Sequence, residues 1–218
     1  MVGESGTSTT KQVYHNYKCV SAKKHTGCNM KPLRKAWIED IVIEEIRKAL
    51  NDVVYIKNLK LKNTTSQYAI RVEESSCGIY NCSINDSKAS VYLKNSPDIY
   101  IGNCSFENNT VSIMLENSVA EIEDTEVKNS TGPQITVRLG SSATIENSKI
   151  NSGAHKGIIV DNSELIIKKS EISDNATLAV EARSNGKVIL EECTSTNESY
   201  CWYHDDGVIE CNNCTNFI

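Results

Sequence analysis

The sequence predicts an all-β fold: a right-handed parallel β-helix of about seven coils over residues 53–218, preceded by a capping helix and a short basic segment. Three observations lead to this prediction. Apolar residues recur with a period of about 22 residues, Asn, Ser and Gly recur between them, and the balance of charge changes sign near residue 50.

An anchor position fixes the register of the repeat. Its successive copies lie 21 to 23 residues apart, at Leu59, Cys82, Cys104, Thr125, Ser148, Ser170, Cys193 and Cys214. Three positions earlier stand Ile56, Ile79, Ile101, Ile122, Ile145, Ile167, Leu190 and Cys211. Because eight units agree in spacing and in chemistry, the repeat is a strong indication of a solenoid.

Further apolar positions complete each unit. Two residues after the anchor come Leu61, Ile84, Phe106, Val127, Ile150 and Ile172, and a second apolar pair reads Ile70/Val72, Val91/Leu93, Ile113/Leu115 and Val137/Leu139. A period near 22 is too short for helical hairpins, and the L-x-x-L-x-L signature of leucine-rich repeats is absent. Each unit fits one coil of a parallel β-helix, right-handed like other parallel crossovers.

On this pattern, residues 53–218 resemble the right-handed parallel β-helix proteins of the pectate-lyase-like kind. The resemblance lies in the repeat and not in a catalytic motif, so it implies a fold and leaves the activity open. The chain also lacks a P-loop, a dinucleotide-binding glycine fingerprint, an H-E-x-x-H motif and a nucleophile elbow.

The register separates inward from outward side chains. Four of the anchor residues are cysteines, which we interpret as small packed side chains. The C-terminal run Cys201, His204, Cys211 and Cys214 has the spacing of a zinc knuckle and is kept as an alternative metal site. Against it, Cys211 and Cys214 fall on core positions, and the alternation places Cys201 inward and His204 outward.

One outward row is rich in carboxylates. Two residues before the anchor stand Tyr80, Gly102, Glu123, Glu146, Lys168 and Glu191, and one residue after it stand Glu126, Lys149 and Glu171. Glu123, Glu146 and Glu191 form an outward acidic face that can bind a cation or a substrate hydroxyl. A solvated charged face is the more common explanation of such a row, and we predict no catalysis from it.

The first fifty residues differ in character from the rest. They hold nine Lys/Arg against five Asp/Glu, a net charge of +4, whereas residues 51–218 carry −9. Only the basic part suits a nucleic acid. No apolar run is long enough to span a bilayer, and the start lacks the pattern of a secretory signal, so we expect a cytoplasmic protein whose nine cysteines are reduced.

The segment MVGESGTSTTKQVYHNYKC, the pair Cys19 and Cys28, and the helix start KPLRKAWIEDIVIEEI resemble the zinc β-ribbon of large serine recombinases. The resemblance covers the part after that family's first C-x2-C, and neither this pair nor the catalytic domain is present. It implies half a zinc site at Cys19 and Cys28, where His15 or His25 can supply a third ligand. It also implies DNA contact by basic side chains, here Lys18, Lys23, Lys24, Lys31, Arg34 and Lys35.

Three segments are therefore expected: a ribbon-like segment at 1–30, an amphipathic helix at 31–52 and the β-helix at 53–218. The helix carries apolar Trp37, Ile41, Val42, Ile46 and Leu50 at helical spacing, and the first coil follows at once. We expect these side chains to cover the open end of the solenoid, because exposed terminal strands invite edge pairing. The final coil has no such cover, so self-association there is expected.

Three classes of function remain. We favour a non-catalytic binding or scaffold module that uses the β-helix face for a polysaccharide or a protein, fused to a DNA-binding ribbon remnant. The alternatives are a DNA-binding accessory fragment of a serine recombinase and a polysaccharide lyase or hydrolase. No cofactor is expected, except zinc at partial occupancy.

The purified protein is predicted to bind well under one zinc ion per chain, because a structural site needs four ligands and only two match the family pattern. Chelators should leave the solenoid folded, as circular dichroism before and after chelation will show. Stoichiometric zinc lost together with the fold would contradict this prediction and favour the site at Cys201, His204, Cys211 and Cys214.

Overall fold

The structure is a computed structural model that describes residues 2–7, 13–18, 33–36, 38, 41 and 54–218. Contacts between residues divide the chain into two units, Met1–Asp52 and Val53–Ile218. Within the described residues, no helix combines the length and apolarity needed to cross a bilayer.

The first unit contains a three-stranded antiparallel sheet. Strand β1 (Val2–Thr7) pairs with β2 (Val13–Lys18), and the other edge of β2 pairs with β3 (Leu33–Arg34). Residues 35, 36, 38 and 41 are helical. The predicted helix boundary at residue 31 was wrong, because Leu33 and Arg34 extend the sheet instead.

The predicted helical cap falls mostly outside the described residues. Trp37, Val42, Ile46 and Leu50 are not described, and Ile41 is 43% exposed. Whether this helix covers the first coil therefore stays a prediction.

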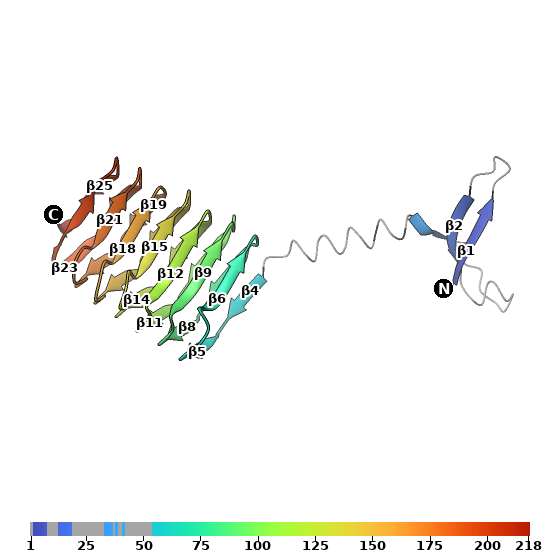
Figure 1. Cartoon of the computed structure of the whole chain (residues 1–218), viewed down its shortest axis with the longest axis horizontal. Helices are drawn as coiled ribbons and strands as arrows, with labels where there is room; N and C mark the ends of the chain where they lie inside the picture. Colours follow the sequence, from blue (N-terminus) through green and yellow to red (C-terminus); the bar gives the residue numbers. More distant parts are fainter. Residues whose placement is uncertain (1, 8–12, 19–32, 37, 39–40, 42–53) are drawn as a thin grey trace. The chain divides into compact units, whose positions relative to one another are not determined.

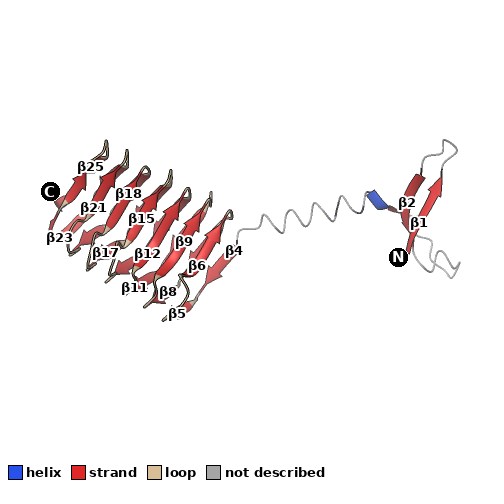
Figure 2. Ribbon diagram, in the orientation of Figure 1, coloured by secondary structure: helices blue, strands red, loops and turns tan. Residues whose placement is uncertain are grey.

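The second unit is a right-handed parallel β-helix of about seven turns with three sheets (Figures 1 and 2), which confirms the predicted fold class. Sheet I consists of β4 (Val54–Lys57), β7 (Cys77–Tyr80), β10 (Ile99–Gly102), β13 (Val119–Glu123), β16 (Ser142–Glu146), β19 (Glu164–Lys168), β22 (Lys187–Glu191) and β25 (Val208–Asn212).

Sheet II consists of β5 (Lys60–Lys62), β8 (Ser83–Asn85), β11 (Ser105–Glu107), β14 (Glu126–Lys128), β17 (Lys149–Asn151), β20 (Glu171–Ser173), β23 (Thr194–Ser199) and β26 (Thr215–Phe217). Sheet III consists of β6 (Tyr68–Glu73), β9 (Ala89–Lys94), β12 (Val111–Glu116), β15 (Ile135–Arg138), β18 (Ile158–Asp161), β21 (Val180–Arg183) and β24 (Cys201–Tyr203). Each strand is parallel to its copies in the neighbouring coils.

The core is a set of stacked aliphatic rows inside the solenoid. Ile79, Ile101 and Ile122 are partners in register and lie fully buried, as the repeat predicted. One predicted pair was wrong: the inward residues of β15 are Ile135 and Val137, which pair with the inward residues of β12. Leu139 follows the strand with a positive φ of 60° and is exposed, because the chain turns there towards sheet I.

A residue in the left-handed region turns the chain from sheet I to sheet II in every coil. These residues are Asn58, Asn81, Asn103, Asp124, Asn147, Lys169, Glu192 and Asn213. Asn tolerates this conformation better than most residues, which explains why it recurs in the sequence. The N–H of such a residue donates to the next coil, as from Asn81 to the carbonyl of Gly102 at 3.1 Å.

The anchor position forms a hydrogen-bond ladder along the axis. The N–H of Thr125 donates to Ser148 Oγ, and the N–H of Ser148 donates to Ser170 Oγ, each at 3.1 Å. Each hydroxyl in turn donates to a carbonyl of its own coil, as Ser148 Oγ does to Glu146 at 2.8 Å. The small anchor side chain is therefore a hydrogen-bonding group as well as a packed one.

The last strand of each sheet is paired on one side only among the described strands. Cys211 pairs with Leu190 in the predicted register, yet it is exposed because no described strand lies beyond β25. Trp202 and Tyr203 of β24 are also exposed. Self-association through this end stays a prediction.

Replacing Ser148 by Ala should lower the free energy of unfolding by about 1–3 kcal/mol, because the buried N–H of Thr125 loses its acceptor. Urea denaturation followed by circular dichroism measures the change. Ser142→Ala, on an exposed residue of the same coil, is the matched control and should alter stability by less than about 0.5 kcal/mol. Equal effects of the two substitutions would contradict a role for the ladder.

Candidate functional site

The outward face of sheet I collects the predicted acidic residues. Glu123, Glu146, Lys168 and Glu191 are partners in register on β13, β16, β19 and β22. The structure therefore places them in one row, as the sequence predicted.

Specific partners hold these carboxylates. Glu146 Oε1 lies 3.1 Å from Lys169 Nζ, and Glu191 Oε2 lies 3.3 Å from Lys168 Nζ. The hydrogen bond to Glu146 raises the pKa of Lys169 above its ordinary value. In the part of the chain that the structure describes, no group of three or more His, Cys, Asp or Glu is arranged to hold a metal ion. Glu146 and Glu191 of this row are thus held in local ion pairs.

A column of three tyrosines lies at the other end of the same face. The rings of Tyr55 and Tyr80 have centroids 5.9 Å apart, and those of Tyr80 and Tyr100 are stacked at 4.9 Å. Gly102 leaves room for this column, since a Cβ there would lie 2.4 Å from Tyr100 Cε1. Sequence reasoning missed the column, although glycines alternating with tyrosines at the repeat spacing were a signal for it.

Two charged groups fix the column in place. Lys57 Nζ lies 4.8 Å from the centroid of Tyr55, within the range of a cation–π interaction. The hydroxyl of Tyr100 donates to Glu123 Oε2 at 2.7 Å. This hydrogen bond, together with burial, raises the pKa of Tyr100 to about 12. Tyr55 itself is 58% exposed, so the column presents aromatic surface to a ligand.

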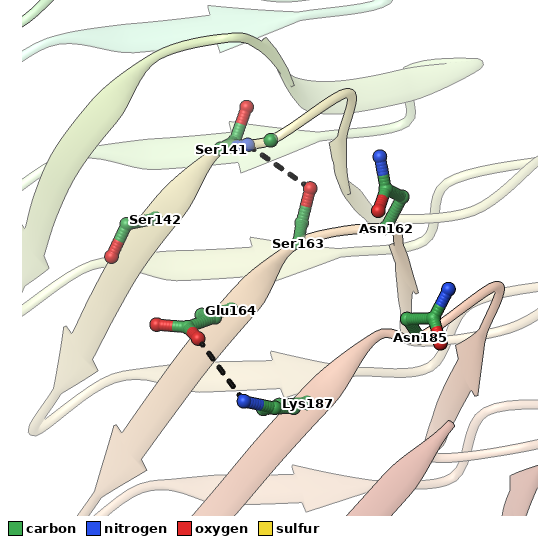
Figure 3. A pocket seen from close by; sticks show the side chains of 8 residues that line it. Ser141, Ser142, Asn162, Ser163, Glu164, Asn185 and Lys187 are labelled. Atoms are coloured by element: carbon green, nitrogen blue, oxygen red, sulfur yellow. Dashed lines mark hydrogen bonds and ion pairs between the residues drawn. The ribbon is translucent and has the colours of Figure 1, made fainter. Parts of the chain in front are cut away.

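A hollow of about 360 Å³ lies where the chain turns from sheet III into sheet I (Figure 3). It is lined by Gly140, Ser141, Ser142, Asn162, Ser163, Glu164, Asn185 and Lys187. Glu164 and Lys187 face each other at 3.6 Å, and Ser163 Oγ accepts from the N–H of Ser141 at 3.1 Å. Ser141 and Ser163 are buried and their hydroxyls are bonded within the protein, whereas the side chains of Asn162, Asn185 and Ser142 are amide and hydroxyl groups of a kind that can bond a ligand hydroxyl.

Sheet III carries a ladder of alternating charge. Its members are partners in register: Glu73, Lys94, Glu116, Arg138, Asp161 and Arg183. Arg138 pairs with Glu116, which also accepts a hydrogen bond from the hydroxyl of Tyr92 at 2.6 Å. Burial opposes the charge on Glu116, but these two bonds hold its pKa below the ordinary value.

Comparison with known proteins agrees with this architecture. A family model described as the right-handed β-helix region matches residues 45–158 and 74–217. The chain belongs to the right-handed β-helix family. This family includes enzymes such as pectate lyase as well as proteins without catalytic activity, so membership does not decide between the two. A search of curated proteins finds no match.

The alternative zinc residues lie in different environments within this β-helix. Cys201 and Cys214 pack against the core, whereas His204 contacts Asp205 and Glu181. Burial, and then the neighbouring thiols, raise the pKa of Cys201 to about 12. A thiolate is the form that binds zinc, and this environment disfavours it.

The N-terminal candidates are described only in part. Cys19, Cys28, His25, Lys23, Lys24 and Lys31 lie outside the described residues, as does the side chain of Lys18. His15, Arg34 and Lys35 are described and exposed. The half zinc site and the DNA-binding set therefore remain predictions.

Removing the charge of residue 123 should lower the pKa of Tyr100. In Glu123→Gln the hydroxyl loses its charged acceptor, so Tyr100 should ionise nearer its ordinary pKa instead of near 12. In the parent, the stability that comes from the raised pKa of Tyr100 is fully present below about pH 10 and is lost as the pH rises from there to about 12, whereas the variant should lack most of this contribution at any pH.

Spectrophotometric titration of tyrosinate measures the change. Tyr92, which also has a pKa raised to about 12 by burial and by Glu116, is the internal control and should titrate as in the parent. An unchanged titration curve in Glu123→Gln would show that the Tyr100 contact does not form in solution.

Proposed function

We propose that this β-helix is a non-catalytic binding module that holds a neutral polysaccharide along the outward face of sheet I. The tyrosine column (Tyr55, Tyr80 and Tyr100) supports the proposal most directly. Aromatic side chains bury large apolar surface at little cost in conformational entropy, and the apolar C–H surface of a sugar ring can pack against them. The rigid sheet below fixes the rings before any ligand arrives.

The polar groups of the same face complement the column. The hollow of Figure 3 supplies amides and hydroxyls from Asn162, Asn185 and Ser142 at the edge of sheet I. Sugar hydroxyls form hydrogen bonds with such groups. Apolar contact at one end of the face and hydrogen bonding further along it together suit an extended sugar chain.

Charge selects the class of polysaccharide. The outward rows of the sheet I strands contain six carboxylates, Glu121, Glu123, Glu146, Glu164, Glu191 and Glu210, and three lysines, Lys57, Lys168 and Lys187. This excess of negative charge repels uronic acid polymers. The ligand we propose is therefore neutral.

Affinity electrophoresis and calorimetry with soluble glucan, mannan and xylan, and with pectin as the acidic comparison, test the proposal. Tyr55→Ala should weaken binding of a neutral polymer about tenfold, which corresponds to about 1.4 kcal/mol. Tyr203→Ala, an equally exposed aromatic residue outside this face, should leave affinity unchanged.

The same samples distinguish a binding module from an enzyme. A non-catalytic module releases no new reducing ends from any of the polymers. Release of fragments would favour the lyase or hydrolase alternative. Binding of pectin alone, or equal losses in Tyr55→Ala and Tyr203→Ala, would contradict the proposed site.

The first unit supports a second proposal, DNA contact through its basic residues. Its three-stranded antiparallel sheet is the kind of structure that the recombinase ribbon implies, and Arg34 of β3 and the following Lys35 are exposed. Replacing Lys23 and Lys24 by Ala should weaken binding to duplex DNA. It should also reduce the slope of log K against log salt concentration by about 2. Fluorescence anisotropy at several salt concentrations measures both, and a parent that binds no DNA at low salt would contradict the proposal.

A further inference from the structure

The turn between β21 and β22 contains the one Asn-Gly pair of the sequence, Asn185 and Gly186. Ser184 and Asn185 both have a positive φ, of 52° and 63°, and the N–H of Gly186 donates to the carbonyl of Arg183 at 2.9 Å. Two successive left-handed residues closed by such a bond form a type I′ turn, for which Asn-Gly is a preferred sequence. The pair therefore has a structural role in the coil.

This role requires glycine after Asn185. A Cβ at position 186 would lie 2.5 Å from the carbonyl oxygen of Val160 and 2.9 Å from that of Arg183. Both are backbone atoms, which cannot move aside as a flexible side chain can. The residue after Asn185 thus has no side chain to hinder the approach of its backbone nitrogen to the amide of Asn185.

The side chain of Asn185 has little to restrain it. Asn185 is exposed and lines the hollow of Figure 3. Among the described residues, no side-chain hydrogen bond holds its amide. Asn117, in an earlier turn from sheet III to sheet I, differs in this respect, because its Nδ2 donates to Asn95 Oδ1 at 3.0 Å. The amide of Asn185 can therefore turn towards its own backbone.

The next coil shows that an aspartate fits this turn. Asp206 and Gly207 occupy the corresponding positions after β24, Asp206 has the same φ of 63°, and the N–H of Gly207 closes that turn with a bond of 3.0 Å. An isoaspartate fits less well, because it adds one carbon to the backbone directly before β22. There the N–H of Lys187 donates to the carbonyl of Ser163 at 2.9 Å, and the added carbon displaces this donor.

We propose that Asn185 is a site of spontaneous deamidation. The backbone nitrogen of Gly186 attacks Cγ of Asn185 and forms an N–Cγ bond, while the Cγ–Nδ2 bond breaks and the amide leaves as ammonia with the proton of the Gly186 N–H. Water then opens the cyclic imide. Cleavage of the new N–Cγ bond gives aspartate, and cleavage of the original peptide bond between residues 185 and 186 gives isoaspartate.

The fold sets the rate and the consequence of this reaction. The N–H of Gly186 is bonded in the turn, so attack requires local opening and is slower in the folded chain than in the unfolded one. Each product carries a new negative charge. The charged side chains of the hollow, Glu164 and Lys187, balance each other, so deamidation makes the hollow acidic.

Peptide mapping by mass spectrometry tests the proposal on the full chain, kept folded at mildly alkaline pH. The peptide that contains Asn185 should gain about 1 Da and an isoaspartate about ten times faster than the peptides that contain Asn162 or Asn117. Asn162 lines the same hollow but precedes a serine, and the amide of Asn117 is bonded. Unfolding the chain in urea should accelerate the reaction at Asn185.

Two variants separate the chemistry from its effect on the fold. Asn185→Gly tolerates the positive φ and removes the amide, so its melting temperature should not change with incubation. Asn185→Asp reproduces one product and should melt like the fresh parent, whereas the incubated parent, which contains isoaspartate, should melt about 2 °C or more below it. Circular dichroism measures all three.

Three results would overturn the proposal. The first is an equal rate of deamidation at Asn185 and Asn162, and the second is an unmodified Asn185 in a chain whose other asparagines have reacted. The third is a loss of stability on incubation that is the same in Asn185→Gly as in the parent.

Discussion

Hydrogen bonds between successive coils are the interaction on which the second unit depends. An inner coil donates hydrogen bonds to both of its neighbours and accepts from both, so the coils must keep nearly the same length and turn at the same places. This requirement explains which residues occupy the turns from sheet I to sheet II. Asn81 and Asn103 adopt the left-handed conformation that lets their N–H groups reach the next coil. It also explains Ser148, whose hydroxyl completes bonds that the turning backbone leaves open.

Because the coils stack in register, the fold could be predicted from the sequence. Rows such as Ile79, Ile101 and Ile122 follow from the repeat alone, because identical positions in each coil meet identical surroundings. The prediction failed locally at Leu139, because the apolar pair was placed two residues too far along the chain, where the strand has already ended in a turn. In the first unit, Leu33 and Arg34 join a sheet because of pairing with β2, a contact that helical periodicity does not encode.

The candidate sites were predictable only as far as the repeat extends. The row from Glu123 to Glu191 was found, because its members occupy one position of the unit. The ion-pair partners of this row were not predicted. Lys169, which pairs with Glu146, lies in the turn after β19 and not at a position of the row. The ion pairs of Glu181 with Lys156 and His204 were missed for the same reason. Lys156 comes from a loop and His204 from a turn, so no single spacing joins them to Glu181.

The charge ladder of sheet III has a consequence for how such a chain can change in length. Its signs alternate strictly from Glu73 through Lys94 and Glu116 to Arg183. Duplicating or deleting a single coil would put two like charges side by side, which opposes strand pairing. Duplicating or deleting two adjacent coils together would preserve the alternation. A solenoid of this kind can therefore grow or shrink in steps of two coils more readily than in steps of one.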